Sequence, residues 1–318
     1  MDSITQAALG AAIGEIALGN KIGNKGAILG AAIATIPDLD VVLYLFYEKF
    51  EMLSIHRGYS HSILFSFIGA FLFSYFLKRF KWTKEISYHR LCFFSWVTLL
   101  THMFLDAFTA YGTQLFLPFS DLRFGLDSIN VVDPVYTLPL IIGLGFGLFI
   151  YRTQPNRVKY CYIGLSLSSI YLLLTLVIKS HVNNYFESEL AQQNISCNSI
   201  LTMPVGVANI NWYGVAKTDK GIYMKPYSLL NNSEKAFEYF PTNEFLLDEL
   251  NPILSNKMRW FAKDFYTVEK SGDKIRIYNL QVDIRGIIKN DSIFAPTAGY
   301  FEVTPLSDGT FEFGFGSH

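Results

Sequence analysis

Apolar stretches of 15 to 20 residues recur through the first 178 positions of the chain and then stop. They cover residues 4–18, 26–45, 62–77, 91–108, 135–151 and 161–178. Because a helix needs about 20 apolar residues to cross a bilayer, the pattern predicts a polytopic α-helical membrane domain over residues 1–178, with about five to six membrane segments. The first stretch is the weakest, a short span or a half-span. Gly10 and Gly14 in it, with the small residues 30–32 of the second stretch, would let these two helices pack closely.

Beyond residue 178 the pattern changes to short β-type runs separated by turn signals. Three pairs of runs indicate hairpins, at 207–217 with 222–227, 265–269 with 275–280, and 299–304 with 311–315. One helix is expected over residues 245–261. Residues 179–318 are therefore predicted to form an α+β domain with an antiparallel sheet.

The composition agrees with this division. Charged residues number 24 in residues 1–178 and 29 in residues 179–318, so the second part has the charge density of a water-soluble domain. The formal net charge of −1 leaves no basic face to neutralise phosphates, which excludes nucleic acid as a partner. Three cysteines, Cys92, Cys161 and Cys197, exclude a disulfide-stapled scaffold and a cysteine-based zinc cage.

The basic residues of the connecting loops predict the orientation in the membrane. Loops 20–25, 78–90 and 152–160 together carry ten Lys and Arg residues, whereas the alternate loops carry three. By the positive-inside rule the basic loops face the cytoplasm, so residues 179–318 are expected to be extracytoplasmic. Glu15 lies towards the inner end of the first segment and is expected to snorkel to the lysines of the first loop.

The apolar part contains ionisable residues that a bilayer disfavours. They are Asp38, Asp40, His56, His61, His102 and Asp106. Charged groups inside a membrane cost several kcal/mol each, so such residues suggest a functional site. At ~1.5 Å of rise per helical residue, the predicted orientation brings them to one level in the outer half of the membrane. Segments far apart in the sequence are thus expected to converge on one cluster.

The residue types and their spacing favour metal binding. His102 and Asp106 are four apart on a helix and point the same way. Asp38 and Asp40 would diverge on a regular helix, but Pro37 is expected to break it and present both. A ligand set of His and Asp without Cys suits a divalent metal, and zinc is the preferred candidate, with manganese or iron as alternatives. The number of carboxylates is enough for one or two ions. A proton or ion pathway is the competing interpretation.

Several further residues are weaker candidates for the same site. Asp2 and Gln6 are four apart at the outer end of the first segment and are placed to reach it. Asp133, beside Pro134, is either a ligand or the cap of a helix start. Arg57 lies between candidate ligands and is the better anion-binding group. Arg123 would hold a phosphate or carboxylate, or pair with one of the aspartates near it in the sequence.

The motifs that carry these residues occur in a specific order over residues 1–150. They are Asp2-Ser3-Ile4-Thr5-Gln6, Pro37-Asp38-Leu39-Asp40, His56-Arg57-Gly58-Tyr59-Ser60-His61-Ser62, His102 with Asp106, Tyr111-Gly112-Thr113-Gln114, Pro118-Phe119-Ser120 and Val132-Asp133-Pro134. In this order they resemble the YdjM/YbcI-like family of bacterial inner-membrane proteins, described as membrane-bound metal-dependent hydrolases. The resemblance implies a multi-pass protein of the bacterial inner membrane. It also implies metal ligands at Asp38, Asp40, His56, His61, His102 and Asp106. Gln6 stands where many members carry a histidine, and its amide oxygen would bind a metal only weakly.

Together these features predict a membrane-bound metal-dependent hydrolase in which metal-activated water attacks an ester. A site at headgroup depth beside Arg57 favours a lipid or lipid-linked phosphate ester as substrate, so the expected partners are membrane lipid and an ester-like small molecule. Asp106 or Asp38 would serve as general base. The alternative is a non-enzymatic membrane protein that uses the same cluster for ion or proton passage or for metal-dependent regulation of a partner. The sequence leaves the oligomeric state open.

Overall fold

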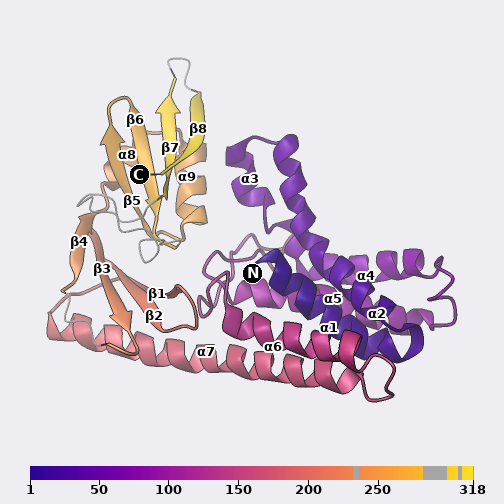
Figure 1. The fold of residues 1–318 in the computed structure, drawn as a ribbon. Coiled ribbons are helices and arrows are strands. Elements are labelled where there is room, and N and C mark those ends of the chain that lie inside the picture. The colour runs from indigo at the N-terminus through magenta and orange to yellow at the C-terminus, as the bar shows by residue number, and fades with distance from the viewer. Residues whose placement is uncertain (232–235, 282–298, 307–309, 318) are drawn as a thin grey trace. The chain divides into compact units, whose positions relative to one another are not determined.

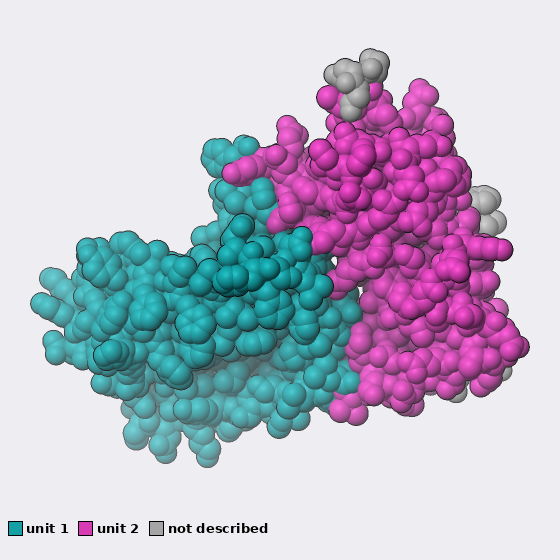
Figure 2. All heavy atoms as spheres, turned by 180° about the vertical axis from the view of Figure 1, so that it is seen from behind, with its two compact units in different colours: residues 1–46, 55–176 teal, residues 47–54, 177–318 magenta. Residues whose placement is uncertain are grey.

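The computed structural model of the chain describes residues 1–231, 236–281, 299–306 and 310–317. It divides into two compact units, residues 1–46 with 55–176, and residues 47–54 with 177–318 (Figure 2). The helices of the first part of the chain are α1 (Ser3–Ile22), α2 (Lys25–Thr35), η1 (Pro37–Leu45), α3 (Lys49–Ile55), η2 (Tyr59–His61), α4 (Ile63–Leu77), α5 (Tyr88–Ala107), α6 (Pro134–Gly145), η3 (Phe146–Ile150) and α7 (Val158–Gln192) (Figure 1). In the first unit α1 packs against α2, α5 and α6.

Glycines allow α1 and α2 to pack with their backbones in contact. A Cβ atom added to Gly30 would lie 1.9 Å from the carbonyl oxygen of Gly10, and one added to Gly14 would lie 2.1 Å from the carbonyl oxygen of Gly26. No side chain fits in these spaces. The close packing predicted from the small residues of the first two segments is therefore confirmed.

Pro37 breaks the second apolar stretch, as the sequence predicts. The helix α2 ends at Thr35, and the 3₁₀ helix η1 begins at Pro37 after a bend of 50°. Proline has no backbone N–H and its ring clashes with the preceding helical turn, which disfavours a regular α-helix at this point. The break places Asp38 and Asp40 in the first turn of η1.

Membrane-spanning length is reached by fewer helices than the apolar pattern suggests. Within the described residues, α7 is the one helix long and apolar enough to cross a membrane, with 35 residues. The count rises to three if α2 with η1, and the α3–η2 region with α4, each form one bent span. The chain therefore has at least one spanning helix, and five to six membrane segments stay a prediction.

The second unit contains two four-stranded antiparallel sheets, which confirms the predicted antiparallel β-structure. The strands follow chain order in each sheet: β1 (Ser199–Val205), β2 (Asn211–Lys217), β3 (Gly221–Ser228) and β4 (Glu238–Pro241), then β5 (Tyr266–Ser271), β6 (Lys274–Asn279), β7 (Gly299–Pro305) and β8 (Phe311–Ser317). The three predicted hairpins correspond to β2–β3, β5–β6 and β7–β8. The strands β1 and β4 were not predicted.

The predicted single helix at 245–261 is wrong in one respect. The structure has two helices there, α8 (Glu244–Asp248) and α9 (Pro252–Phe261). Asn251 caps α9 by accepting a hydrogen bond from the backbone N–H of Ile253, and Pro252 occupies the first helical position. This is the normal start of a new helix.

Glu15 does not snorkel to the first loop. Its side chain is fully buried, and its Oε1 accepts a hydrogen bond of 2.6 Å from Nε of Arg157. Arg157 also donates to the side-chain oxygen of Asn24 at 2.9 Å. The charge of the buried carboxylate is therefore paired through Oε1 with a residue 142 positions away rather than with the lysines of the first loop.

Candidate metal centre

Four side chains from three separate helices meet in the first unit. Asp38 is on η1, His61 ends η2, and His102 and Asp106 are one turn apart on α5. One ligand atom from each lies within 4.8 Å of every other. The side chains of His61, His102 and Asp106 are fully buried, whereas that of Asp38 is 20% exposed. Asp38 therefore borders the accessible side of the group.

The spacing of these four atoms fits a small divalent cation. Nε2 of His61 lies 3.2 Å from Nε2 of His102, 3.4 Å from Oδ1 of Asp38 and 3.3 Å from Oδ2 of Asp106. Nε2 of His102 lies 3.5 and 3.6 Å from the same two oxygens. Ligands about 2.0–2.1 Å from a tetrahedral zinc ion stand roughly 3.3–3.4 Å apart, which matches these separations.

The hydrogen bonding of Asp106 supports the same conclusion. Its Oδ1 accepts from Nε2 of Gln6 at 3.1 Å, contacts the α-amino group of Met1 and lies 3.4 Å from Nη2 of Arg57. Its Oδ2, which faces the two histidines, is buried and has no hydrogen-bond partner among the residues that the structure describes. A buried carboxylate oxygen is costly without a partner. A cation between the carboxylates and the imidazoles would supply one.

Asp40 and His56 lie beside this group. Asp40 accepts hydrogen bonds from Nδ1 of His56 at 2.9 Å, from the backbone N–H of Arg57 at 3.0 Å and from the hydroxyl of Ser60 at 3.0 Å. It lies 3.5 Å from Nδ1 of His61, the ring nitrogen that does not face the cluster. The hydrogen bond of this Nδ1 is made with the hydroxyl of Ser60 at 2.9 Å, and that hydroxyl in turn donates to Asp40. The carboxylate therefore supports His61 through Ser60, as outer carboxylates commonly support metal-binding histidines. A ligand role for Asp40 and His56 stays a prediction.

Gln6 reaches the site, but through its amide nitrogen. Besides Asp106, Nε2 of Gln6 donates to the carbonyl oxygen of His102 at 3.2 Å. It therefore ties α1 to both cluster residues of α5. The sequence indicated that Gln6 would reach the site. In the structure Gln6 does so by donating a hydrogen bond to Asp106.

Asp2 and Asp133 cap helices. The carboxylate of Asp2 accepts from the backbone N–H of Ile4 and of Thr5 at the start of α1. Asp133 accepts from the N–H of Val135 at the start of α6, and its Oδ2 accepts from the hydroxyl of Tyr171 at 2.7 Å. Neither belongs to the group of four, and the capping alternative noted for Asp133 is present.

Arg57 and Arg123 share one aromatic ring. Their guanidinium carbons lie 4.9 and 4.6 Å from the ring centroid of Tyr111, and both residues are buried. Arg57 donates to the hydroxyl of Thr109 at 2.9 Å, and Arg123 donates to the carbonyl oxygen of Tyr111. Tyr111 opens one of the motifs that carry the family resemblance, but no site role was assigned to it, and Thr109 was not singled out. An uncharged residue in a loop gives no local signal of what it contacts.

Exposed apolar side chains flank the cluster along the chain. Leu39, between the two aspartates of η1, is 57% exposed, and Tyr59, between Gly58 and Ser60, is 67% exposed. Apolar side chains at such positions are suited to contact lipid rather than water.

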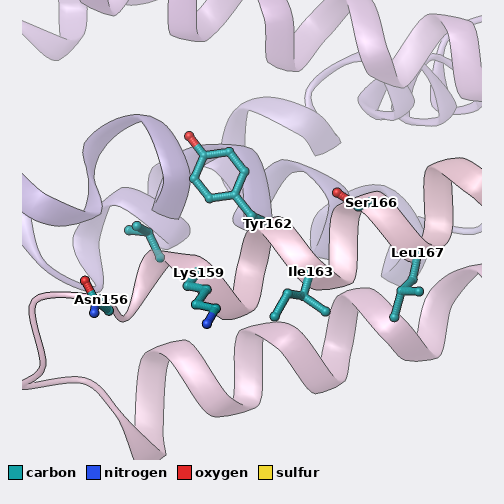
Figure 3. Close-up of a pocket in the computed structure, with 7 residues that line it drawn as sticks. Asn156, Lys159, Tyr162, Ile163, Ser166 and Leu167 are labelled. Atoms are coloured by element: carbon teal, nitrogen blue, oxygen red, sulfur yellow. The ribbon is translucent and has the colours of Figure 1, made fainter.

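A separate pocket lies on α7. It has a volume of about 530 Å³ and is lined by Asn156, Val158, Lys159, Tyr162, Ile163, Ser166 and Leu167 (Figure 3). None of these residues belongs to the His/Asp cluster. Ile163 and Leu167 are exposed on the helix that is long enough to span a membrane, so this pocket fits a lipid-facing groove.

Comparison with known proteins gives three matches of interest. The model of the YdjM inner membrane protein family matches residues 1–182. The chain is 34% identical over 124 residues to inner membrane protein YbcI of Escherichia coli (strain K12), covering 38% of this chain and 69% of that protein. It is 33% identical over 141 residues to the uncharacterized protein YfhP of Bacillus subtilis (strain 168), covering 42% of each chain, so less than half of that relative is spanned. No solved structure matches.

Proposed function

Since the chain belongs to the YdjM inner membrane protein family, we propose that it is a membrane-bound metal-dependent hydrolase acting on a lipid or lipid-linked phosphate ester. The observation that carries the proposal is the group of Asp38, His61, His102 and Asp106, whose ligand atoms lie within 4.8 Å of one another in a largely buried site. A divalent cation held there would supply Lewis-acid polarisation of the ester and lower the pKa of a water molecule.

The protein residues have separable roles in this proposal. His61 and His102 would bind the cation through Nε2. Asp40 would hold the ring of His61 in place through the hydroxyl of Ser60. Asp106 is fully buried, so its role is ligation. Asp38 is partly exposed and presents Oδ1 to the two histidines. It is therefore the better placed of the two carboxylates to accept a proton from the attacking water.

The surroundings of the cluster favour a lipid-like substrate. Leu39 and Tyr59 project beside it with more than half of their surface exposed. An apolar chain of a substrate could lie along these side chains while its ester reaches Asp38. A water-soluble ester has no apolar chain that could bury these exposed side chains. The apolar side chains beside the site therefore support a substrate taken from the membrane.

We further propose a multi-pass topology in the inner membrane with residues 179–318 outside the cytoplasm. Cys197 tests the orientation, because it lies in this region and is partly exposed. A membrane-impermeant maleimide should label Cys197 in intact cells, and Cys197→Ser should abolish that signal. Burial raises the pKa of this thiol, so its labelling should be slower than that of a fully exposed cysteine and is followed over time at neutral pH. Labelling only after the cells are lysed would contradict the orientation.

The alternative function is proton or ion passage. Its support is a continuous series of short contacts from His56 to Asp40 at 2.9 Å, from Asp40 to His61 at 3.5 Å, and from His61 to His102 at 3.2 Å. Such a series can also relay protons. Because a relay needs no bound metal, metal content separates the two functions.

The decisive measurement is the metal content of the purified full chain. We expect bound zinc, manganese or iron in the wild type and its loss in His102→Ala. His89→Ala is the matched control, because His89 lies on the same helix, is exposed and should leave metal content unchanged. A wild type without tightly bound metal, after growth and purification without chelators, would refute the hydrolase proposal and favour the relay.

Turnover is then measured on phospholipids and on p-nitrophenyl phosphate esters. Wild type and His89→Ala should hydrolyse the same substrates, and His102→Ala should lose that activity. A metal-loaded wild type that hydrolyses neither phospholipids nor generic phosphate esters would contradict the proposed substrate class.

A further inference from the structure

Two buried arginines lie beside the candidate metal centre. Arg57 follows His56 in the loop before η2, and Arg123 lies in the segment between α5 and α6. Both residues are less than 7% exposed. Each places its guanidinium carbon within 5 Å of the ring centroid of Tyr111. Bringing two positive charges to one ring in a buried region is unfavourable unless a negative charge compensates them.

Arg57 connects this pair to the metal centre. Its Nη2 is 3.4 Å from Oδ1 of Asp106, and its Nη1 donates to Thr109. Its Nε is buried, and no hydrogen-bond partner for it lies in the described part of the chain. The backbone of Arg57 has a φ of +56°, which is uncommon for a non-glycine residue. The carboxylate of Asp40 and the N–H of Gln114 hold it there by hydrogen bonds to its N–H and carbonyl.

The charge of the group becomes positive when a cation binds. Three carboxylates, those of Asp38, Asp40 and Asp106, stand against the guanidiniums of Arg57 and Arg123. The α-amino group of Met1, in contact with Asp106, adds a third positive charge and balances the three carboxylates. A divalent ion would turn this balance into a surplus of two positive charges. Burial, together with the nearby Arg57, lowers the pKa of Arg123 to about 10. That direction is expected when a positive charge lies near another in a poorly solvated place.

We propose that Arg57 and Arg123, held on the ring of Tyr111, form the subsite that binds the phosphate group of the substrate next to the metal centre. The proposal rests on the proposed hydrolase function and extends it to substrate recognition. Arginine suits this task because its planar guanidinium donates two parallel hydrogen bonds to phosphate oxygens. Arg57 would orient the phosphate towards Asp38 and the cation. Arg123 would donate further hydrogen bonds to the same phosphate.

The test is phosphate binding by the purified full chain, measured by calorimetry with and without added zinc. Inorganic phosphate and dihexanoyl phosphatidic acid serve as probes, and they distinguish a free phosphate from a lipid headgroup. Arg123→Lys and Arg57→Lys keep the charge but lose the planar fork. We expect each to weaken binding at least about tenfold. Arg79→Lys is the matched control, because Arg79 also lies over a tyrosine ring, that of Tyr75.

Metal content and thermal melting are recorded for every variant. Weaker phosphate binding with unchanged metal content in Arg123→Lys supports the subsite, because Arg123 is not one of the four candidate ligands and donates to the carbonyl oxygen of Tyr111. A zinc-loaded wild type that binds neither probe would overturn the subsite and leave the metal centre standing. Unchanged phosphate affinity in both lysine variants would do the same. A wild type without bound metal would refute the hydrolase proposal. The phosphate affinities of the two arginine variants would then still show whether phosphate binds at Arg57 and Arg123.

Discussion

Asp40→Asn separates a residue that positions a ligand from a residue that binds the metal. The substitution keeps the shape of the side chain and removes its charge. An asparagine oxygen can still accept from the N–H of Arg57 and the hydroxyl of Ser60, which share Oδ2 of Asp40. Its NH₂ group then faces Nδ1 of His56, which now meets a donor instead of an acceptor. The carboxylate behind His61 is lost at the same time.

The expected effect follows from that position. Loss of a carboxylate that orients a metal-binding histidine typically lowers metal affinity about 10- to 100-fold, which corresponds to about 1.4–2.7 kcal/mol. His102→Ala removes a ligand atom itself and should abolish tight binding. The difference between the two variants is therefore large enough to measure.

Zinc affinity is measured by competition with a chromophoric chelator in detergent. Asp121→Asn, an exposed aspartate in the loop after α5, controls for the loss of one negative charge. If Asp40→Asn loses zinc as completely as His102→Ala, Asp40 is a ligand, as the family resemblance implies. If its zinc affinity equals that of the wild type, the contact with His61 does not support the metal centre. Either result would refute the positioning role.

Three further predictions concern stability. Arg157→Gln should leave the carboxylate of Glu15 buried and unpaired, at a cost of about 3–5 kcal/mol, and the double variant with Glu15→Gln should melt at a higher temperature than Arg157→Gln alone. Equal melting of the single and double variants would show that the pair is not coupled. Gly30→Leu should separate α1 from α2, since even a Cβ atom at this position lies 1.9 Å from a backbone oxygen. It should lower the melting temperature more than a leucine placed at an exposed position of α2, which serves as the control. Burial lowers the pKa of Lys225, but its hydrogen bond to Glu189 outweighs burial and raises that pKa above the ordinary value. While Glu189 is ionised, the pair should therefore stabilise the protein fully below about pH 10.4 and lose this contribution as the pH rises through the folded-state pKa. Lys225→Met should lack this alkaline loss, and a wild type that melts equally at pH 9 and pH 11.5 would contradict it.

The fold could be predicted from sequence where the signal is local. Pro37 breaks a helix because of its own covalent structure, and the break is present. The hairpins β2–β3, β5–β6 and β7–β8 follow from alternating runs joined by turn residues, and all three pair as predicted. The division of 245–261 into two helices was missed because its apolar spacing continues across Asn251 and Pro252.

The candidate site was predicted in part. His102 and Asp106 share a helix face, so their proximity follows from one helical turn. The convergence of Asp38 and His61 with them was inferred from membrane depth, and the structure brings the four together. The different surroundings of Asp40, and the support that Gln6 gives to Asp106, depend on side-chain directions that depth does not specify.

By itself the sequence determined which ionisable residues lie in apolar segments and therefore suggest a functional site. It also determined where a helix breaks and which strands form hairpins. These properties arise from the chemistry of single residues and from their neighbours along the chain. The tertiary structure alone decided that Glu15 pairs with Arg157 and that Arg57 and Arg123 share the ring of Tyr111. Such contacts join positions 12 to 142 residues apart, and they depend on how whole helices pack, which no local pattern encodes.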